Sequence, residues 1–99
     1  MNLPTRFLPE AREEFGRAVE WYEERGEDLA KDFMLRVREV VRRVAANPKM
    51  HALAFRDVRK AVVTRFPYIV LYREVNEELI VVSVFHTSRD PDEWKSRAG

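Results

Sequence analysis

Residues 79–85 read Leu-Ile-Val-Val-Ser-Val-Phe, and this stretch decides the fold because six of its seven residues are apolar. A strand with one face in water alternates apolar and polar residues, whereas a continuous apolar run of this length predicts a strand buried on both faces. We therefore expect a central strand with further strands beside it and packed elements above and below it.

Two amphipathic helices are predicted upstream of this strand. Pro9 suits the first turn of a helix, and Gly26 interrupts the helical pattern where a C-terminal cap is expected. Asn47-Pro48 ends the second helix, because proline disfavours the α conformation in the residue before it. Residues 10–46 therefore predict an antiparallel helical hairpin with a short turn. The apolar stripes are Ala11, Phe15, Ala18, Val19 and Tyr22 in the first helix and Ala30, Phe33, Val37, Val40, Val41 and Val44 in the second.

Short β-prone segments flank the hairpin. Phe7-Leu8 predicts an edge strand before it, and residues 55–65 and 68–72 predict two strands between the hairpin and the central strand. Asp90-Pro91 starts a last helical turn containing Trp94, which we expect to cover the core. The order β-α-α-β-β-β predicts an α+β domain, with an N-terminal strand, an antiparallel helical hairpin packed on a small antiparallel sheet, and a short C-terminal helical turn.

Length and composition narrow the classes of protein. The 99 residues predict one domain over residues 1–99, and the lack of cysteine excludes disulfides and thiolate nucleophiles. No apolar run approaches the ~20 residues of a membrane span, and residues 1–6 lack a signal-peptide pattern, so we expect a cytoplasmic protein with no membrane contact. There is no glycine-rich phosphate loop or zinc motif, and His51 and His86 fall in different predicted elements. We therefore expect no metal and no cofactor.

Positive charge is concentrated in the middle of the chain. Residues 33–73 carry ten Lys and Arg against two acidic residues, although the net charge of the whole chain is only +1. A basic segment of this kind attracts an anionic partner, either nucleic acid or an acidic protein segment. An uneven spread of solubilising charges is the alternative interpretation.

Several of these cations belong to the predicted sheet. Arg59 and Arg65 share a face of the strand predicted over residues 55–65 if no bulge intervenes, because strand side chains alternate between faces. Arginine presents a planar fork of donors that matches phosphate or carboxylate groups. The structural alternative is a solvated sheet face with cross-strand ion pairs.

His86 is the candidate acid or base. It ends the central strand on the face that carries Ile80, Val82 and Val84, by the period of two. Imidazole titrates near neutral pH, and Arg89, three residues further on, offers a phosphate ligand at the same strand end. A histidine at the edge of the core, bonded to a backbone carbonyl, is the alternative.

Three motifs together resemble the RelE/ParE superfamily of toxins. They are Arg65-Phe66-Pro67-Tyr68 with Tyr72, His86-x-x-Arg89-Asp90-Pro91 followed by Trp94, and Trp21-Tyr22 in the first helix. The resemblance covers nearly the whole chain, and the family's fold has the same β-α-α-β-β-β order. It implies the toxin half of a type II toxin–antitoxin pair, which arrests growth when free, contributes to plasmid stabilisation and is held inactive by an antitoxin encoded beside it.

The superfamily divides by target. RelE-like members cut mRNA in the ribosome, and ParE-like members poison DNA gyrase. RelE-like nucleases tend to carry an arginine where this chain has Ile69 and a C-terminal tyrosine where it has Trp94, so the resemblance favours the ParE-like branch. One alternative is a ribosome-dependent endoribonuclease with His86, Arg65 and Arg89 as catalytic residues. A second is a family member that binds its partner but is not toxic.

The resemblance also implies partners and a binding surface. The expected partners are the cognate antitoxin and DNA gyrase, or the ribosome and mRNA in the nuclease alternative, within a homodimer or a toxin–antitoxin hetero-oligomer. We expect one surface to bind both target and antitoxin. Its residues are Arg59, Lys60, Arg65, Arg73, His86 and Arg89.

Overall fold

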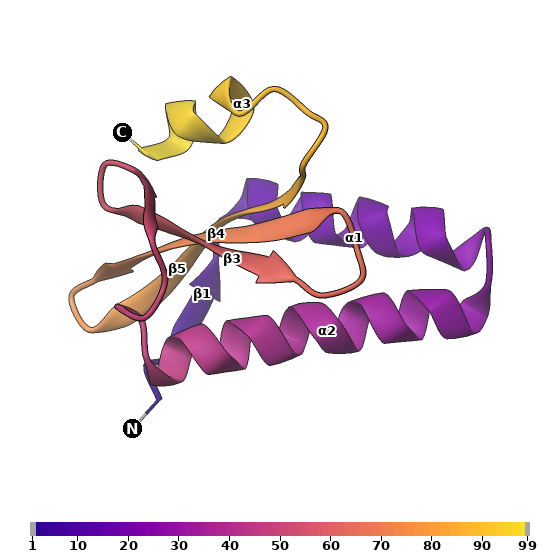
Figure 1. Cartoon of the computed structure of the whole chain (residues 1–99), viewed down its shortest axis with the longest axis horizontal. Coiled ribbons are helices and arrows are strands. Elements are labelled where there is room, and N and C mark those ends of the chain that lie inside the picture. The colour runs from indigo at the N-terminus through magenta and orange to yellow at the C-terminus, as the bar shows by residue number, and fades with distance from the viewer. Residues whose placement is uncertain (1, 99) are drawn as a thin grey trace.

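The structure, a computed structural model, describes residues 2–98 as a sheet with helices on both of its faces (Figure 1). Five strands form the sheet in the order β1-β5-β4-β3-β2. The elements are β1 (Thr5–Phe7), α1 (Pro9–Glu23), α2 (Glu27–Ala46), β2 (Leu53–Phe55), β3 (Val58–Val63), β4 (Tyr68–Val75), β5 (Glu78–His86), α3 (Asp92–Lys95) and the 3-10 turn η1 (Ser96–Ala98). This order confirms the predicted α+β fold and the helical hairpin.

The direction of the first strand differs from the prediction. β1 pairs parallel with β5, with Phe7 opposite Val81, while the other neighbouring strands are antiparallel, so the sheet is mixed and not wholly antiparallel. Antiparallel neighbours can be joined by a tight hairpin, but β1 and β5 are separated by most of the chain. No local turn therefore sets the direction of β1.

The strand predicted over residues 55–65 is interrupted. A turn at Arg56 and Asp57 separates β2 from β3, and Arg56 has a φ of 54°. Arg73 in β4 closes over this turn with two hydrogen bonds to the Asp57 carboxylate, of 2.6 and 3.1 Å. These bonds hold the pKa of Asp57 below its usual value, chiefly through the side-chain hydrogen bonding with Arg73.

Arg59 and Arg65 do not share a strand, which corrects the expectation that they are co-facial. Arg59 lies near the start of β3, whereas Arg65 follows the end of β3 in the turn to β4, with a φ of 73°. The two residues are six positions apart, which corresponds to about 20 Å of extended chain at a rise of about 3.3 Å per residue.

Both faces of β5 are covered, as the sequence predicts. Seven of its nine residues are buried. The helical hairpin covers one face with a core that includes Phe33, and α3 covers the other with a smaller core around Trp94, which is 3% exposed. Trp94 therefore closes the second core, as expected.

A β-bulge in β5 changes which face His86 occupies. Leu71 pairs with Ser83 and the next residue, Tyr72, pairs with Val81, so Val82 is the extra residue. Val82 packs on the α3 side, while Val84 packs with the helical hairpin. The prediction that His86 shares a face with Val82 and Ile80 is therefore wrong, because the bulge breaks the period of two. His86 lies two residues after Val84 on the same face of β5, and it therefore faces α1.

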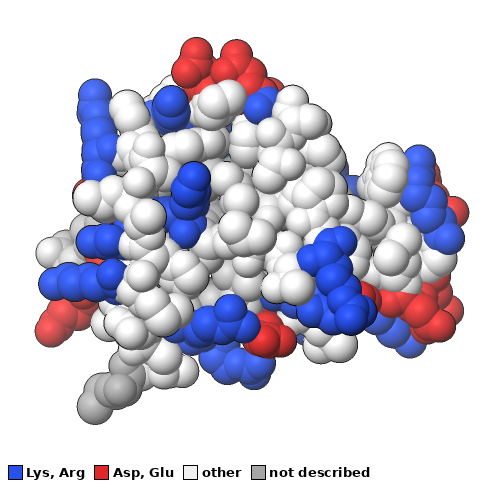
Figure 2. Space-filling model, in the orientation of Figure 1, with Lys and Arg blue, Asp and Glu red and all other residues white. Residues whose placement is uncertain are grey.

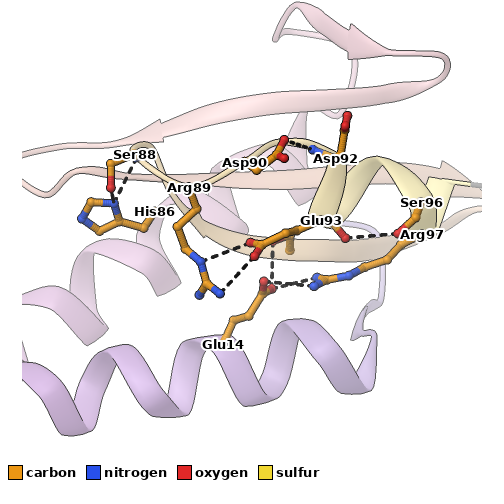
Figure 3. A network of polar contacts seen from close by, with 10 residues as sticks. Glu14, His86, Ser88, Arg89, Asp90, Asp92, Glu93, Ser96 and Arg97 are labelled. Atoms are coloured by element: carbon orange, nitrogen blue, oxygen red, sulfur yellow. Dashed lines mark hydrogen bonds and ion pairs between the residues drawn. The ribbon is translucent and has the colours of Figure 1, made fainter.

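A polar network fastens the C-terminal segment to the start of α1 (Figure 3). The Glu14 carboxylate accepts hydrogen bonds from both terminal nitrogens of Arg97, at 2.9 and 3.1 Å, and from Ser83 at 2.8 Å. Arg97 also donates to the backbone carbonyl of Val82, at the bulge. The side chains of Glu14 and Arg97 are largely buried, at 10% and 16% exposure, so solvent screens the attraction between their charges only weakly.

The Glu14 network makes a prediction about stability. We expect Glu14→Gln to lower the free energy of unfolding by about 1.5–3 kcal/mol, because a largely buried guanidinium loses its ionised partner. The matched control is Glu13→Gln at the adjacent position, whose ion pair with Arg17 is about two-thirds exposed. That change is expected to cost less than about 0.5 kcal/mol. Urea unfolding followed by circular dichroism measures both, and equal losses would contradict the assignment.

The Asp57–Arg73 pair makes a prediction about pH. Because the folded pKa of Asp57 is lowered, its stabilisation is present above the unfolded pKa and is lost as the pH falls through the folded pKa. The loss of stability on acidification should therefore be smaller in Asp57→Asn than in the native chain, while at pH 7 the variant should be the less stable of the two. Unfolding curves at pH 7 and pH 2.5 test this, and an identical acid-induced loss in both proteins would refute it.

Candidate functional site

A pocket of about 360 Å³ lies between α1 and the adjoining ends of β4 and β5. The bulge in β5 directs His86 into this region, and the segment after β5 brings Arg89 beside it. Ten residues line the pocket: Glu14, Arg17, Ala18, Trp21, Tyr22, Pro67, Tyr68, Val84, His86 and Arg89. The site thus contains the predicted acid or base and one of the predicted cations.

The imidazole of His86 is held by its neighbour Ser88 (Figure 3). The Ser88 backbone N–H donates to Nδ1 at 3.1 Å, and the Ser88 hydroxyl lies 2.8 Å from the same nitrogen. Because a backbone N–H can only donate, Nδ1 is the acceptor and the neutral ring carries its proton on Nε2. The ring also makes an edge-to-face contact with Tyr68, with centroids 5.1 Å apart. His86 therefore presents a hydrogen-bond donor through Nε2, while its Nδ1 atom already accepts a hydrogen bond from Ser88.

The other ionisable groups of the pocket are not available as bases either. Burial raises the pKa of Tyr68 and of Tyr22, so both phenols stay protonated at neutral pH. The Glu14 carboxylate already accepts three hydrogen bonds from Arg97 and Ser83. The pocket consequently offers donors and aromatic surfaces rather than a proton acceptor.

Arg89 places a cation at the mouth of the pocket. Its guanidinium pairs with the Glu93 carboxylate one turn later, with contacts of 3.1 and 3.2 Å (Figure 3). Both side chains are about half exposed, at 52% and 40%, so the pair is open to competition from an external anion. Arg89 can therefore contact a carboxylate or phosphate without leaving a buried acid unpaired.

Trp21 lines the pocket but is not among the site residues predicted from the sequence. Tyr22 is buried, but Trp21 is 49% exposed, with its ring 5.0 Å from the Tyr22 ring and the Arg25 guanidinium 3.3 Å above it. The signal was present in the sequence, since Trp21 lies off the apolar stripe formed by Ala18 and Tyr22. Tryptophan is enriched at protein contact surfaces.

The other predicted cations lie elsewhere. Arg59 and Arg73 belong to the far end of the sheet, where Arg59 donates to the backbone carbonyl of His51 at 2.6 Å and Arg73 holds Asp57. Lys60 is exposed on β3, and Arg65 is exposed in the turn before the pocket residue Pro67. On the face drawn in Figure 2, Lys and Arg are likewise spread among acidic residues and not gathered in one patch. The structure brings His86 and Arg89 together and does not place all six residues on one surface.

No helix within residues 2–98 combines the length and apolar character needed to cross a bilayer.

A solved structure described as the chromosomal ParDE TA system from P. aeruginosa superimposes on this fold with a TM-score of 0.76. The match covers 87% of this chain and 97% of the other, at 14% sequence identity, and it shows a shared fold. A search of curated proteins gave no match. The sequence profile described as the ParE toxin of the type II toxin-antitoxin system parDE matches residues 5–91. This match covers most of the chain and agrees with the resemblance seen in the motifs, so the chain belongs to the ParE toxin family.

Proposed function

We propose that this protein is a cytoplasmic toxin that arrests growth by binding DNA gyrase and is neutralised by an antitoxin. Membership of the ParE toxin family supports the first half of the proposal. The solved neighbour is described as part of a ParDE TA system, which supports pairing with an antitoxin. The target surface in this proposal is the pocket that contains His86, Arg89, Trp21 and Tyr68.

One observation supports the choice of binding over cleavage: the two candidate proton acceptors of the pocket, His86 Nδ1 and the Glu14 carboxylate, already accept hydrogen bonds within the fold. RNA cleavage by attack of a ribose 2′-hydroxyl needs a group that accepts the hydroxyl proton. His86 Nδ1 is occupied by Ser88, and the Glu14 carboxylate is occupied by Arg97 and Ser83. An exposed tryptophan beside hydrogen-bond donors, as Trp21 is here, is instead typical of a protein-binding hot spot.

The position of Trp94 in the structure also argues against the endoribonuclease alternative. Trp94 stands where RelE-like nucleases tend to carry a tyrosine, but it is buried on the opposite face of the sheet from His86. It cannot reach a substrate in the pocket. A family member that binds its partner without toxicity is the second alternative, and growth measurements separate it from the other two.

The first experiment is induction of the protein in cells, with growth and primer extension on a reporter mRNA followed together. We expect growth arrest with intact message, and inhibition of purified gyrase in a supercoiling assay. New cleavage ends in the message would assign the chain to the nuclease alternative. Normal growth with soluble, folded protein would support the non-toxic alternative.

Substitutions in the pocket sharpen this test. A binding surface that loses the His86 donor in His86→Ala loses about 0.5–1.5 kcal/mol, or up to about tenfold in gyrase inhibition. A nuclease that loses its acid or base loses about 10²–10⁴-fold in cleavage. Trp21→Ala and Arg89→Glu are each expected to weaken gyrase inhibition at least tenfold, because they remove an aromatic contact and reverse a charge.

The matched control is Lys31→Glu, which changes charge by the same amount as Arg89→Glu at an exposed position of α2 outside the pocket. Its inhibition of gyrase should equal that of the native protein. If Trp21→Ala and Arg89→Glu remain folded and inhibit gyrase as strongly as the control, the pocket is not the target surface.

A further inference from the structure

The His86 pocket contains three hydrogen-bond donors that the fold itself does not use. His86 offers its Nε2–H, because Nδ1 already accepts a hydrogen bond from Ser88. The phenol hydroxyls of Tyr22 and Tyr68 make no hydrogen bond within residues 2–98. Among the same residues, the buried side-chain polar atom without a partner is His51 Nε2, so the two phenol oxygens remain open to solvent.

The three donors lie close together. The Tyr68 ring is edge-to-face with both the Tyr22 ring and the His86 ring, with centroids 6.3 and 5.1 Å apart. The pKa of Tyr68 is raised chiefly by burial and further by the Tyr22 phenol, while the Arg89 guanidinium opposes this rise. Both charge effects require that Tyr22 and Arg89 lie near the Tyr68 hydroxyl. The donors therefore converge on one part of the pocket, beside a cation.

Two arginines line the pocket, and each pairs with an exposed acid one turn away. Arg17 contacts Glu13 at 3.3 Å, and Arg89 contacts Glu93 at 3.1 Å (Figure 3). The four side chains are between 40% and 69% exposed. Exposed ion pairs of this kind contribute little to stability, so both guanidinium groups can turn to an incoming anion at small cost.

The charges around the pocket suit a ligand with a single negative charge. A hollow of about 330 Å³ adjoins the pocket and shares three residues with it. Its lining holds four acidic and three basic residues, which are Glu10, Glu13, Glu14, Glu93, Arg17, Arg89 and Arg97. A nucleic-acid strand carries a negative charge at every phosphate, so a strand anchored in the pocket would meet these glutamates as it left. A single carboxylate would occupy only the part of the pocket that is rich in donors.

We propose that the pocket receives one acidic side chain, an aspartate or a glutamate, of the target protein. The inference deepens the proposed function and rests on it, because it names the group of the target that this surface recognises. Carboxylate oxygens only accept hydrogen bonds and offer about four acceptor positions, so one carboxylate can satisfy the imidazole N–H and both phenol O–H groups.

The rest of the pocket would strengthen this contact. Arg17 and Arg89 would add charge-assisted hydrogen bonds, because the guanidinium fork matches the geometry of a carboxylate. Ala18, Pro67 and Val84 provide an apolar lining that would shield these bonds from water. A charged group that is fully hydrogen-bonded and shielded in this way fixes which partner binds and in which orientation.

Removal of the two phenol hydroxyls tests the donors while keeping the aromatic rings. We expect Tyr22→Phe/Tyr68→Phe to bind purified gyrase at least about tenfold more weakly than the native chain in isothermal titration calorimetry, because two bonds to a charged group are lost. The matched control is Tyr72→Phe, which removes a hydroxyl that donates to the Pro48 carbonyl outside the pocket. Its affinity for gyrase should equal that of the native chain, and circular dichroism checks that each variant is folded.

Removal of a competing acid should have the opposite effect. Glu93→Gln deletes the carboxylate that pairs with Arg89 in the free protein, so this variant should bind gyrase more tightly than the native chain. Glu39→Gln is the control, because it deletes the partner of Arg43 in a similarly exposed pair on α2, outside the pocket. Unchanged or weaker binding by Glu93→Gln would contradict the role given to Arg89.

A direct probe tests the chemistry without gyrase. Aspartate blocked as its N-acetyl and N-methylamide derivative is titrated at millimolar concentrations into the isotope-labelled native chain, with blocked asparagine as the neutral control of the same shape. We expect the aspartate to shift the NMR signals of the His86 imidazole and the Trp21 indole to saturation, and the asparagine to leave them unchanged. Equal responses to both compounds would overturn the proposal. Tighter binding of inorganic phosphate or of a short single-stranded RNA at the same signals would assign the pocket to phosphate groups instead.

The two sets of measurements separate this inference from the proposed function. If the native chain binds blocked aspartate but not gyrase, the target is a different protein, and the proposed function fails while the carboxylate site stands. If the chain binds gyrase and Tyr22→Phe/Tyr68→Phe binds it as tightly as Tyr72→Phe does, the carboxylate site fails and the gyrase proposal stands.

Discussion

Burial of both faces of β5 is the constraint on which the rest of the structure depends. The helical hairpin covers one face, so the chain must return across the end of the sheet to cover the other with Trp94 and Ala98 (Figure 1). The return segment passes the start of α1, where Arg97 is fixed by Glu14. The pocket beside His86 is formed by this crossing, and its position is a consequence of how the core is closed.

The β-bulge at Val82 links this core to the site. Without an extra residue, the period of two would put His86 on the same face as Val82, under α3. The bulge turns the last part of β5 so that Val84 and His86 face the hairpin instead. Arg97 donates to the Val82 carbonyl at this point, and Ser83 reaches Glu14. The bulge therefore has two effects: the Val82 carbonyl accepts a hydrogen bond from Arg97, and the His86 side chain is directed toward α1. Bulges near functional sites often redirect a side chain in this way.

The sequence predicts where the helices and strands lie along the chain better than it predicts how the strands pair and in which direction they run. Helix and strand spans depend on local periodicity, and the predicted hairpin over residues 10–46 agrees with α1 and α2. The bulge at Val82 and the parallel direction of β1 depend on how β5 pairs with its neighbours, so no local pattern contains them. The turn at Arg56 joins neighbouring strands, and Arg73 of β4 closes over it. The predicted cations are scattered because Arg59 and Arg73 lie at the far end of the sheet from Arg65 and Arg89. The exposed position of Trp21 was predictable from its place off the apolar stripe.

Some arginines of this chain donate hydrogen bonds within the fold, and others do not. Arg59, Arg73 and Arg97 each hold a backbone carbonyl or a carboxylate of the domain. Arg38 and Arg42 hold neither within residues 2–98, and they repel each other across one turn of α2. Charge counted along the sequence does not distinguish these two groups, because the difference lies in which acids the fold brings within reach.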